Sequence, residues 1–405
     1  MKIIGIVSEY NPFHKGHQYQ IEKSRQDLNA SGVVAIMSGN FVQRGYPAIY
    51  NKWVRAEMAV RSGVNLVIEL PTYFATSSAE PFARGAVELL HHSGVVTHLS
   101  FGSEVDELNA LKEISTLLNN PTDTFTEALS TSLTEGSSFP AARSKALAKA
   151  LPELVTRLDL NQSNIILAVE YLKALQQLNS TIEPYLVKRQ GSSYHDDRLD
   201  SPFVSATAVR KLIHELPERL FTGDWIPQSV MEVLKRTPFR ASKIEDFEKL
   251  ILYALRMSNA QELSSFRDIS EGLENKLLEA SHTSSTYEML VQNVKSKRYT
   301  QTRINRVLLN TLLGIKPIEI NLEKEGYFRV LAFDVVGQKI LREMKKKSSL
   351  PVITNINKHK DFLAESPLLQ LDVKATEIYQ LGQIEPAWIK GGLDFLAKPY
   401  QHKIE

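Results

Sequence analysis

Hydrophobic and polar positions follow two alternating patterns along the first hundred residues. Short β-branched, apolar runs that are typical of buried strands cover residues 3–8, 32–37, 64–70 and 95–101. Amphipathic stretches with apolar residues near helical spacing lie between them, at 17–28, 52–62 and 79–92. Strands that alternate with helices pair in parallel through right-handed crossovers. The pattern predicts a doubly wound parallel sheet in a Rossmann-like α/β domain, which binds ligands at the carboxyl ends of its strands.

The later chain is predicted to be mostly helical. Residues 105–178 form a helical insertion in the first domain, followed by a strand-like run at 182–188. The rest is helical to about residue 313, before a strand at 327–336 and helices at 338–347 and 372–381. We therefore expect two domains, an α/β domain at 1–216 and a mostly helical one at 217–405.

Composition narrows the class of protein without naming a partner. The 405 residues are 43% hydrophobic and 23% charged, with a formal net charge of +2, which is typical of soluble globular chains. Cysteine is absent, which excludes disulfides, thiolate zinc sites and cysteine nucleophiles. No run approaches the roughly 20 apolar residues that cross a bilayer, so we expect a cytoplasmic protein with no membrane partner.

Charge is uneven in the second half of the chain. The window 291–360 holds fifteen Lys or Arg and five Asp or Glu, a surplus of +10 against +2 for the whole chain. Its basic residues are interleaved with Tyr299 and include Lys297, Arg298, Arg303 and Arg306, with Lys345, Lys346 and Lys347 further on. Such a stretch suits a phosphodiester backbone, although a solvated lysine-rich helix face has the same composition.

The first predicted strand ends in a motif that suits phosphate chemistry. After Glu9 the chain reads Tyr-Asn-Pro-Phe-His-Lys-Gly-His, so His14 lies on a turn and His17 on the first turn of a helix. The amides at a helix start favour phosphate, and two histidines at this spacing can donate hydrogen bonds as charge develops on an attacked α-phosphate. Two unrelated surface histidines or a metal-binding pair remain alternatives. The place of the motif after an N-terminal strand favours the nucleotide-binding interpretation.

A second motif offers groups for the β- and γ-phosphates. Ser205, Thr207 and Arg210 place two hydroxyls and a cation within one predicted helical turn. An ordinary serine cap with a solvated arginine is the alternative. Together the two motifs resemble the H-x-G-H and S-x-T-x-x-R pair of the nucleotidyltransferase superfamily.

Longer strings are similar to one family within that superfamily, the bacterial tRNA(Met) cytidine acetate ligases. They span nearly the whole chain, at residues 9–17, 37–48, 67–71, 101–104, 297–303 and 372–375. The resemblance implies that ATP, with Mg²⁺, activates acetate as acetyl-adenylate. The acetyl group would then pass to N4 of the wobble cytidine of elongator tRNA(Met). The chain would be an ATP-dependent, carbon–nitrogen bond-forming ligase.

The resemblance also implies the site residues. His14 and His17 would be catalytic. The ATP site would comprise Val7, Ser8, Glu9, Tyr10, Asn11, Pro12, Phe13, His14, Lys15, Gly16, His17, Gln18, Tyr19, Gln20, Gly102, Asn164, Arg189, Ser205, Thr207 and Arg210. Contacts to tRNA would come from Lys297, Arg298, Arg303 and Arg306, and further basic candidates for pyrophosphate or RNA are Arg44, Lys52 and Arg55.

Two positions depart from the family pattern. Lys15 fills a slot where a smaller polar residue is expected, and Asn65 stands where aspartate is usual, so we assign no metal ligand. Two other functions stay open. One is a small-molecule adenylyltransferase that uses the same motifs, and the other is a non-catalytic RNA-binding protein regulated by ATP.

Overall fold

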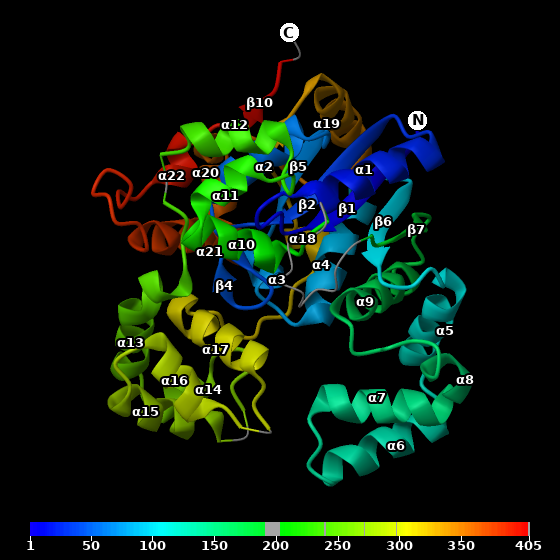
Figure 1. The fold of residues 1–405 in the computed structure, drawn as a ribbon, viewed down its shortest axis with the longest axis vertical. Coiled ribbons are helices and arrows are strands. Elements are labelled where there is room, and N and C mark those ends of the chain that lie inside the picture. The colour runs from blue at the N-terminus through cyan, green and yellow to red at the C-terminus, as the bar shows by residue number, and fades with distance from the viewer. Residues whose placement is uncertain (191–202, 239, 271, 297, 404–405) are drawn as a thin grey trace.

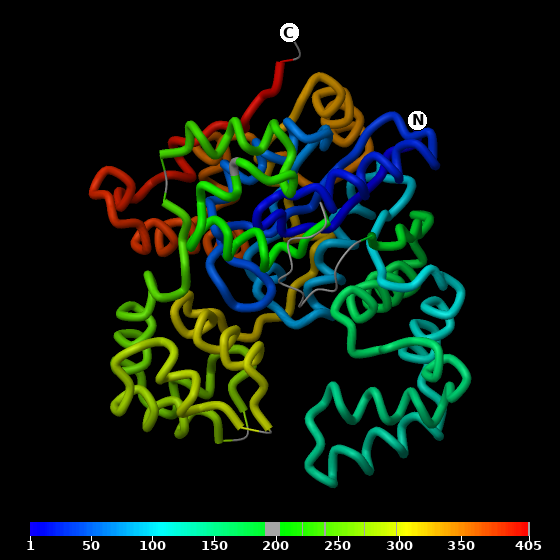
Figure 2. Tube along the Cα trace, in the orientation of Figure 1, coloured from blue at the N-terminus to red at the C-terminus, as the bar shows by residue number. Residues whose placement is uncertain are grey.

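The computed structural model describes residues 1–190, 203–238, 240–270, 272–296 and 298–403, and its centre is an eight-stranded sheet (Figures 1 and 2). The strands of this sheet are β1 (Ile3–Ser8), β2 (Gly32–Ser38), β5 (Leu66–Leu70), β6 (His98–Ser103), β7 (Glu183–Lys188), β8 (Phe328–Phe333), β9 (Val352–Ile353) and β10 (Tyr400–Gln401). Their order is β10-β8-β5-β2-β1-β6-β7, with β9 also beside β8. A separate hairpin pairs β3 (Phe41–Val42) with β4 (Tyr46–Pro47).

Helices cover both faces of the sheet, which confirms the predicted α/β class. The helices of this part are α1 (Lys15–Leu28), α2 (Lys52–Arg61), α3 (Thr72–Ala75), α4 (Ala79–His92), α10 (Ala206–Glu215), α11 (Pro217–Thr222) and α12 (Gln228–Arg236). Alternate residues of β1 enter different cores: Ile4 packs with α2, α10 and α12, and Ile3 packs with α4. Because both faces are covered, β2 and β5 are buried at every position.

Two helical arms extend from the same side of the sheet (Figures 1 and 2). The first is the predicted insertion, with α5 (Leu108–Asn119), α6 (Asp123–Thr134), α7 (Phe139–Ala150), α8 (Pro152–Val155) and α9 (Ser163–Gln177). The second has its own apolar core and comprises η1 (Ile244–Phe247), α13 (Glu248–Met257), α14 (Ala260–Ser264), α15 (Leu273–Thr283), α16 (Tyr287–Val294) and α17 (Gln301–Leu313). None of the described helices is both long and apolar enough to span a membrane.

The C-terminal quarter returns to the sheet, which the predicted boundary after residue 216 does not anticipate. Strand β8 pairs antiparallel with β5, and β9 and β10 pair parallel with β8, so the sheet is mixed rather than wholly parallel. The remaining helices here are α18 (Leu322–Glu325), α19 (Val335–Lys347), η2 (Ile356–Lys358), α20 (Lys360–Glu365), α21 (Pro367–Leu381) and α22 (Leu393–Leu396). In the described part of 217–405, the helices from η1 to α17 share an apolar core, which Phe41 of β3 and Tyr379 of α21 join to the rest of the chain.

Two predicted strands differ most from the structure in their limits. The apolar run from Val95 starts before β6, because Val95 and Val96 pack in the core ahead of the first paired residue, His98. The run at 327–336 ends early, since the Asp334 side chain accepts a hydrogen bond from the Gly337 amide at 2.7 Å and starts α19 at Val335. A side-chain cap therefore turns an apolar, strand-like string into a helix.

Candidate active site

The turn after β1 holds both motif histidines in one defined orientation. His14 is the N-cap of α1, and its Nδ1 accepts a hydrogen bond from the Gly16 amide at 3.0 Å. His17 Nδ1 accepts one from the His14 amide at 3.2 Å, and the two rings stack with centroids 3.7 Å apart. Because both Nδ1 atoms act as acceptors, each neutral ring carries its proton on Nε2. Gly16 is needed here, since a Cβ would lie 2.9 Å from the His14 ring.

Burial keeps these rings uncharged. It lowers the pKa of His14 to about 3, helped by the nearby charges of Arg189 and Arg210. It also lowers the pKa of His17 well below the usual value, with His14 and Arg189 adding to the effect. Near neutral pH both histidines are therefore hydrogen-bond donors through Nε2 rather than general acids.

The low pKa values predict acid sensitivity of the nucleotide-free protein. Below pH 6.5 the unfolded state binds protons at both histidines while the folded state does not, so stability falls as pH falls from 6.5 towards 3. Each histidine contributes at most about 1.4 kcal/mol per pH unit. Urea unfolding at pH 7 and pH 5 should show a smaller loss for the His14→Gln, His17→Gln variant than for the wild type. The exposed His282→Gln is the control, and equal losses in all three proteins would contradict the prediction.

A cavity of about 680 Å³ is lined by these histidines, by the ends of β1 and β6, and by α7, α9 and α17. The predicted site residues that line it are Val7, Ser8, Glu9, Tyr10, Asn11, His14, His17, Gln20, Gly102, Asn164, Arg189, Arg210 and Arg306. Other predicted ATP residues do not line it, namely Pro12, Phe13, Lys15, Gly16, Gln18, Tyr19, Ser205 and Thr207. Phe13 is fully buried in the core, and Lys15 pairs with Asp224 outside the cavity.

The second motif is joined directly to the first. Arg210 donates one hydrogen bond to the Asn11 carbonyl at 2.8 Å and another to the Thr207 hydroxyl at 3.0 Å. Ser205 is the buried N-cap of α10 and accepts from the Ala208 amide at 3.1 Å. The structure therefore brings Arg210 to the cavity, while the two hydroxyls are engaged within the protein. Direct contact of Ser205 and Thr207 with ATP stays a prediction.

Two of the further basic candidates are structural. Lys52 is buried and forms ion pairs with Glu69 at 2.8 Å and Asp394 at 2.9 Å. Arg55 is also fully buried, and it donates to main-chain carbonyls that include those of Glu9 and Ser38. Neither is available to pyrophosphate or RNA. The partners of Lys52 and Arg55 lie far from them in the sequence, so local sequence patterns did not indicate that these two side chains are buried.

Arg44 does line the cavity, and it donates to Ser163 at 3.0 Å. Sequence reasoning missed other cavity residues from the two arms: Phe139, Arg143, Tyr171, Thr300 and Thr302. Only the packing of the arms against the sheet brings them together.

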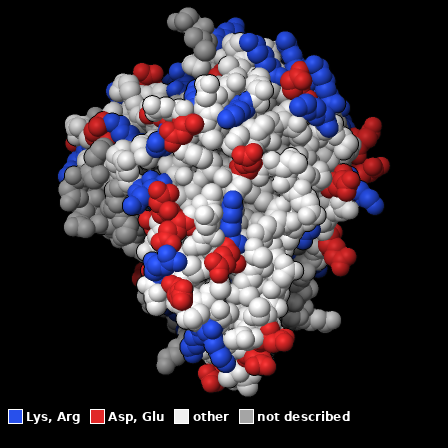
Figure 3. Space-filling model, turned by 90° about the vertical axis from the view of Figure 1, so that its right-hand side faces the viewer, with Lys and Arg blue, Asp and Glu red and all other residues white. Residues whose placement is uncertain are grey.

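The basic window is divided between distant surfaces. Arg306 lines the cavity, and Arg303 donates to Ser270 at 2.8 Å and lies over the Tyr299 ring. Lys297 lies outside the described residues, and Arg298 is exposed. The last turn of α19 carries Lys345, Lys346 and Lys347, far from α17 in Figure 1. Figure 3 shows basic side chains gathered at that upper end of the molecule and mixed charges below it.

Asn65 has a structural environment rather than one that suits a metal. Its Oδ1 accepts from Arg25 at 2.9 Å and from the Val33 amide at 2.8 Å, and its Nδ2 donates to Asp334 at 2.7 Å. It precedes β5, at the end of the sheet opposite the cavity. Asn65 at this position therefore connects the start of β5 to Asp334, the residue between β8 and α19.

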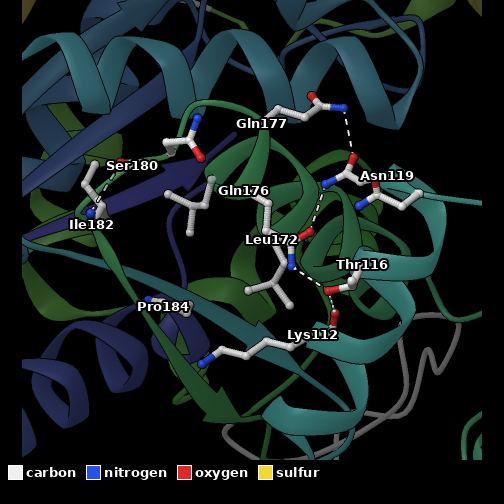
Figure 4. Close-up of a pocket in the computed structure, with 12 residues that line it drawn as sticks. Lys112, Thr116, Asn119, Leu172, Gln176, Gln177, Ser180, Ile182 and Pro184 are labelled. Atoms are coloured by element: carbon white, nitrogen blue, oxygen red, sulfur yellow. Dashed lines mark hydrogen bonds between the residues drawn. The ribbon is translucent and has the colours of Figure 1, made fainter.

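A second hollow of about 690 Å³ lies between α5, α9 and the start of β7 (Figure 4). Its amide side chains satisfy one another, since Asn119 donates to Gln176 at 2.8 Å and accepts from Gln177 at 2.9 Å. It lies at the amino end of β7, away from the histidines. The cavity at the carboxyl ends of β1 and β6 is therefore the candidate site.

Comparisons with known proteins agree with this geometry. The family model of the HIGH nucleotidyl transferases matches residues 1–388. A tRNA(Met) cytidine acetate ligase of Clostridium perfringens is 41% identical over 98% of this chain and 99% of its own. One from a Thermoanaerobacter species is 42% identical over 98% of both chains. The crystal structure of Thermotoga maritima TmcAL bound with alpha-thio ATP superimposes with a TM-score of 0.92 at 34% identity, over the whole of both chains. The chain therefore belongs to the HIGH nucleotidyl transferases and, within them, to the family of the tRNA(Met) cytidine acetate ligases.

Proposed function

We propose that this chain is an ATP-dependent ligase that joins acetate to N4 of the wobble cytidine of elongator tRNA(Met), with release of AMP and pyrophosphate. The carrying observation is the cavity at the end of β1, with two neutral histidines whose Nδ1 atoms are both fixed by backbone amides. The names of the relatives supply the substrates, acetate and tRNA(Met). The solved relative with an ATP analogue supports ATP as the cosubstrate.

In the first step, an acetate oxygen attacks the α-phosphorus of ATP and pyrophosphate leaves. No proton moves in this step, so the protein has only to position the reactants and stabilise charge. The Nε2–H groups of His14 and His17 donate to oxygens of the attacked phosphate, and the amino end of α1 favours the same charge. Arg189 and Arg210 line the cavity and neutralise the remaining phosphates.

Mg²⁺ is expected to accompany ATP. Within the described ranges, no group of three or more His, Asp or Glu side chains could hold a metal ion on its own. The ion would therefore be held mainly by phosphate oxygens and water, as is common for this cation. With tRNA as the acceptor, we place the enzyme in the cytoplasm.

Mass spectrometry tests the function directly. Elongator tRNA(Met) is incubated with the protein, acetate and ATP, and the wobble nucleoside is analysed for N4-acetylcytidine, with labelled ATP reporting pyrophosphate release. We expect acetate-dependent pyrophosphate release and acetylated tRNA. Transfer of AMP to a small molecule without acetate would instead support the adenylyltransferase.

The basic residues at positions 297–303 of the sequence predict salt-dependent tRNA binding. The variant Lys297→Gln, Arg298→Gln, Arg303→Gln should bind tRNA(Met) more weakly and lower the slope of log affinity against log salt by about two, because each lost phosphate contact removes roughly 0.7. Filter binding between low and high salt measures both quantities. The matched control neutralises Lys345, Lys346 and Lys347 on α19. Equal losses in both variants would contradict a tRNA site at α17, and loss of ATP–pyrophosphate exchange as well would indicate a folding role.

A further inference from the structure

Three described carboxylates line the cavity, and only one of them lacks a cationic partner. Glu80 pairs with Lys173 at 2.8 Å. Glu170 pairs with Arg143 at 2.6 Å and with Lys173 at 2.9 Å. Glu9 forms no ion pair with the described part of the chain, although Arg44, Arg189 and Arg210 line the same cavity. The buried Arg55 interacts with Glu9 electrostatically without forming an ion pair, so no salt bridge neutralises the Glu9 carboxylate.

Glu9 is also held firmly in place. Its Oε1 accepts a hydrogen bond from the Gln43 amide at 3.0 Å, and its main-chain carbonyl accepts one from the buried guanidinium of Arg55. These contacts fix the residue from the turn between β3 and β4 and from α2. They leave Oε2 without a hydrogen-bond donor among the described residues. The side chain is half-buried, so one oxygen can face a ligand.

An unpaired carboxylate is an unexpected neighbour for ATP. It repels the phosphates, and that repulsion is stronger in a partly buried site than in bulk water. Binding of ATP alone would favour a neutral or cationic residue here. The arrangement is explained if the reaction needs a base after pyrophosphate has left.

Acetyl transfer has such a need. We propose that Glu9 is the catalytic base that takes the proton from N4 of the tRNA cytidine as the amine attacks acetyl-adenylate. This proposal rests on the proposed function. A bond forms between N4 and the acetyl carbonyl carbon, the bond from that carbon to the AMP oxygen breaks, and AMP leaves with the electron pair. The N4 proton passes to Glu9 Oε2 and then to water.

The other groups of the cavity are less suited to this proton. The two histidines hold their Nδ1 atoms in hydrogen bonds to backbone amides, and burial keeps their pKa values low. The other two carboxylates are neutralised by their cations. The cytosine of the tRNA would enter the cavity from the side of the two arms. There Phe139 is 57% exposed at the start of α7, and Thr300 lies at the start of α17.

The Glu9→Gln variant separates the two half-reactions, since the amide still accepts from Gln43 but cannot take a proton. We expect near-normal acetate-dependent ATP–pyrophosphate exchange and a roughly 100-fold loss in single-turnover acetyl transfer to tRNA(Met), the lower end of the range for general base catalysis. Hydroxylamine attacks acyl-adenylates without a protein base. The variant should therefore still form acetyl-hydroxamate at the wild-type rate.

Each outcome decides the matter. Equal loss of exchange and transfer, in a variant that unfolds at the wild-type temperature, would assign Glu9 to ATP or metal binding and overturn the proposal. Unchanged transfer would overturn it as well. If Glu9→Gln is unstable, Glu9→Asp keeps the carboxylate, and it should retain more transfer than Glu9→Ala. The control Glu88→Gln on α4, whose carboxylate pairs with Arg84 outside the cavity, should change neither half-reaction. Failure of the wild type to acetylate tRNA would instead count against the proposed function.

Discussion

Replacing both His14 and His17 with alanine is expected to abolish acetate-dependent ATP–pyrophosphate exchange, with a loss of about 10⁴-fold. Each ring presents one Nε2–H donor, because its Nδ1 already accepts a backbone amide. Removal of one preorganised donor to a developing oxyanion costs about 10²–10³ in rate. Two donors to one phosphate, each at the smaller value, give about 10⁴ when their effects multiply. Exchange of labelled pyrophosphate into ATP measures the loss.

The same variant distinguishes catalysis from folding and from a purely binding role. Alanine at His14 also removes the cap of α1, which costs about 1 kcal/mol, so unfolding is measured alongside activity. A His91→Ala, His92→Ala variant on α4 is the matched control, since these residues lie outside the cavity. Retention of tRNA by the inactive double variant is expected. Unchanged exchange would remove the histidines from the mechanism and favour the non-catalytic RNA-binding protein.

The parts of the site that sequence predicted are local. The turn from Glu9 to His17 follows β1 and begins α1 as expected, because a strand, a proline-containing turn and a helix cap are all encoded within a few residues. The helical insertion at 105–178 was also predicted and corresponds to helices α5 to α9, since amphipathic spacing is a local property. A family resemblance added the substrates, which no local pattern carries.

The parts that sequence missed depend on contacts between distant segments. Arg143 lies on α7 of the first arm and lines the same cavity as the ends of β1 and β6, which only the tertiary structure brings together. Strand β8 joins β5 after more than 250 intervening residues, and nothing in the composition near Phe328 indicates which sheet it enters. Arg55 was a candidate phosphate ligand because its charge is visible in the sequence, whereas its burial is not.

Lys52→Met is expected to cause the largest loss of stability. The ammonium group lies between Glu69 at 2.8 Å and Asp394 at 2.9 Å, and all three side chains are 1% exposed. Removing the ammonium group leaves the buried Glu69 without its cation and Asp394 with only Arg329 at 3.4 Å, which costs about 3–5 kcal/mol. Burial raises the pKa of Glu69 to about 8, and Lys52 opposes that rise. Urea unfolding measures the change in the free energy of unfolding.

The stability deficit of Lys52→Met is expected to depend on pH. Burial raises the pKa of Glu69, and without Lys52 the folded protein keeps the Glu69 proton while the unfolded chain releases it near pH 4.5, so the variant loses stability as pH rises. Its deficit should therefore be larger at pH 8 than at pH 6. The control Lys23→Met breaks an exposed pair with Asp27 and should cost less than about 1 kcal/mol. Adding Glu69→Gln to Lys52→Met should recover much of the loss, because Asp394 keeps the buried Arg329 guanidinium at 3.4 Å as its partner. Equal effects of Lys52→Met and Lys23→Met would mean that α22 is joined to α2 by packing rather than by this ion cluster.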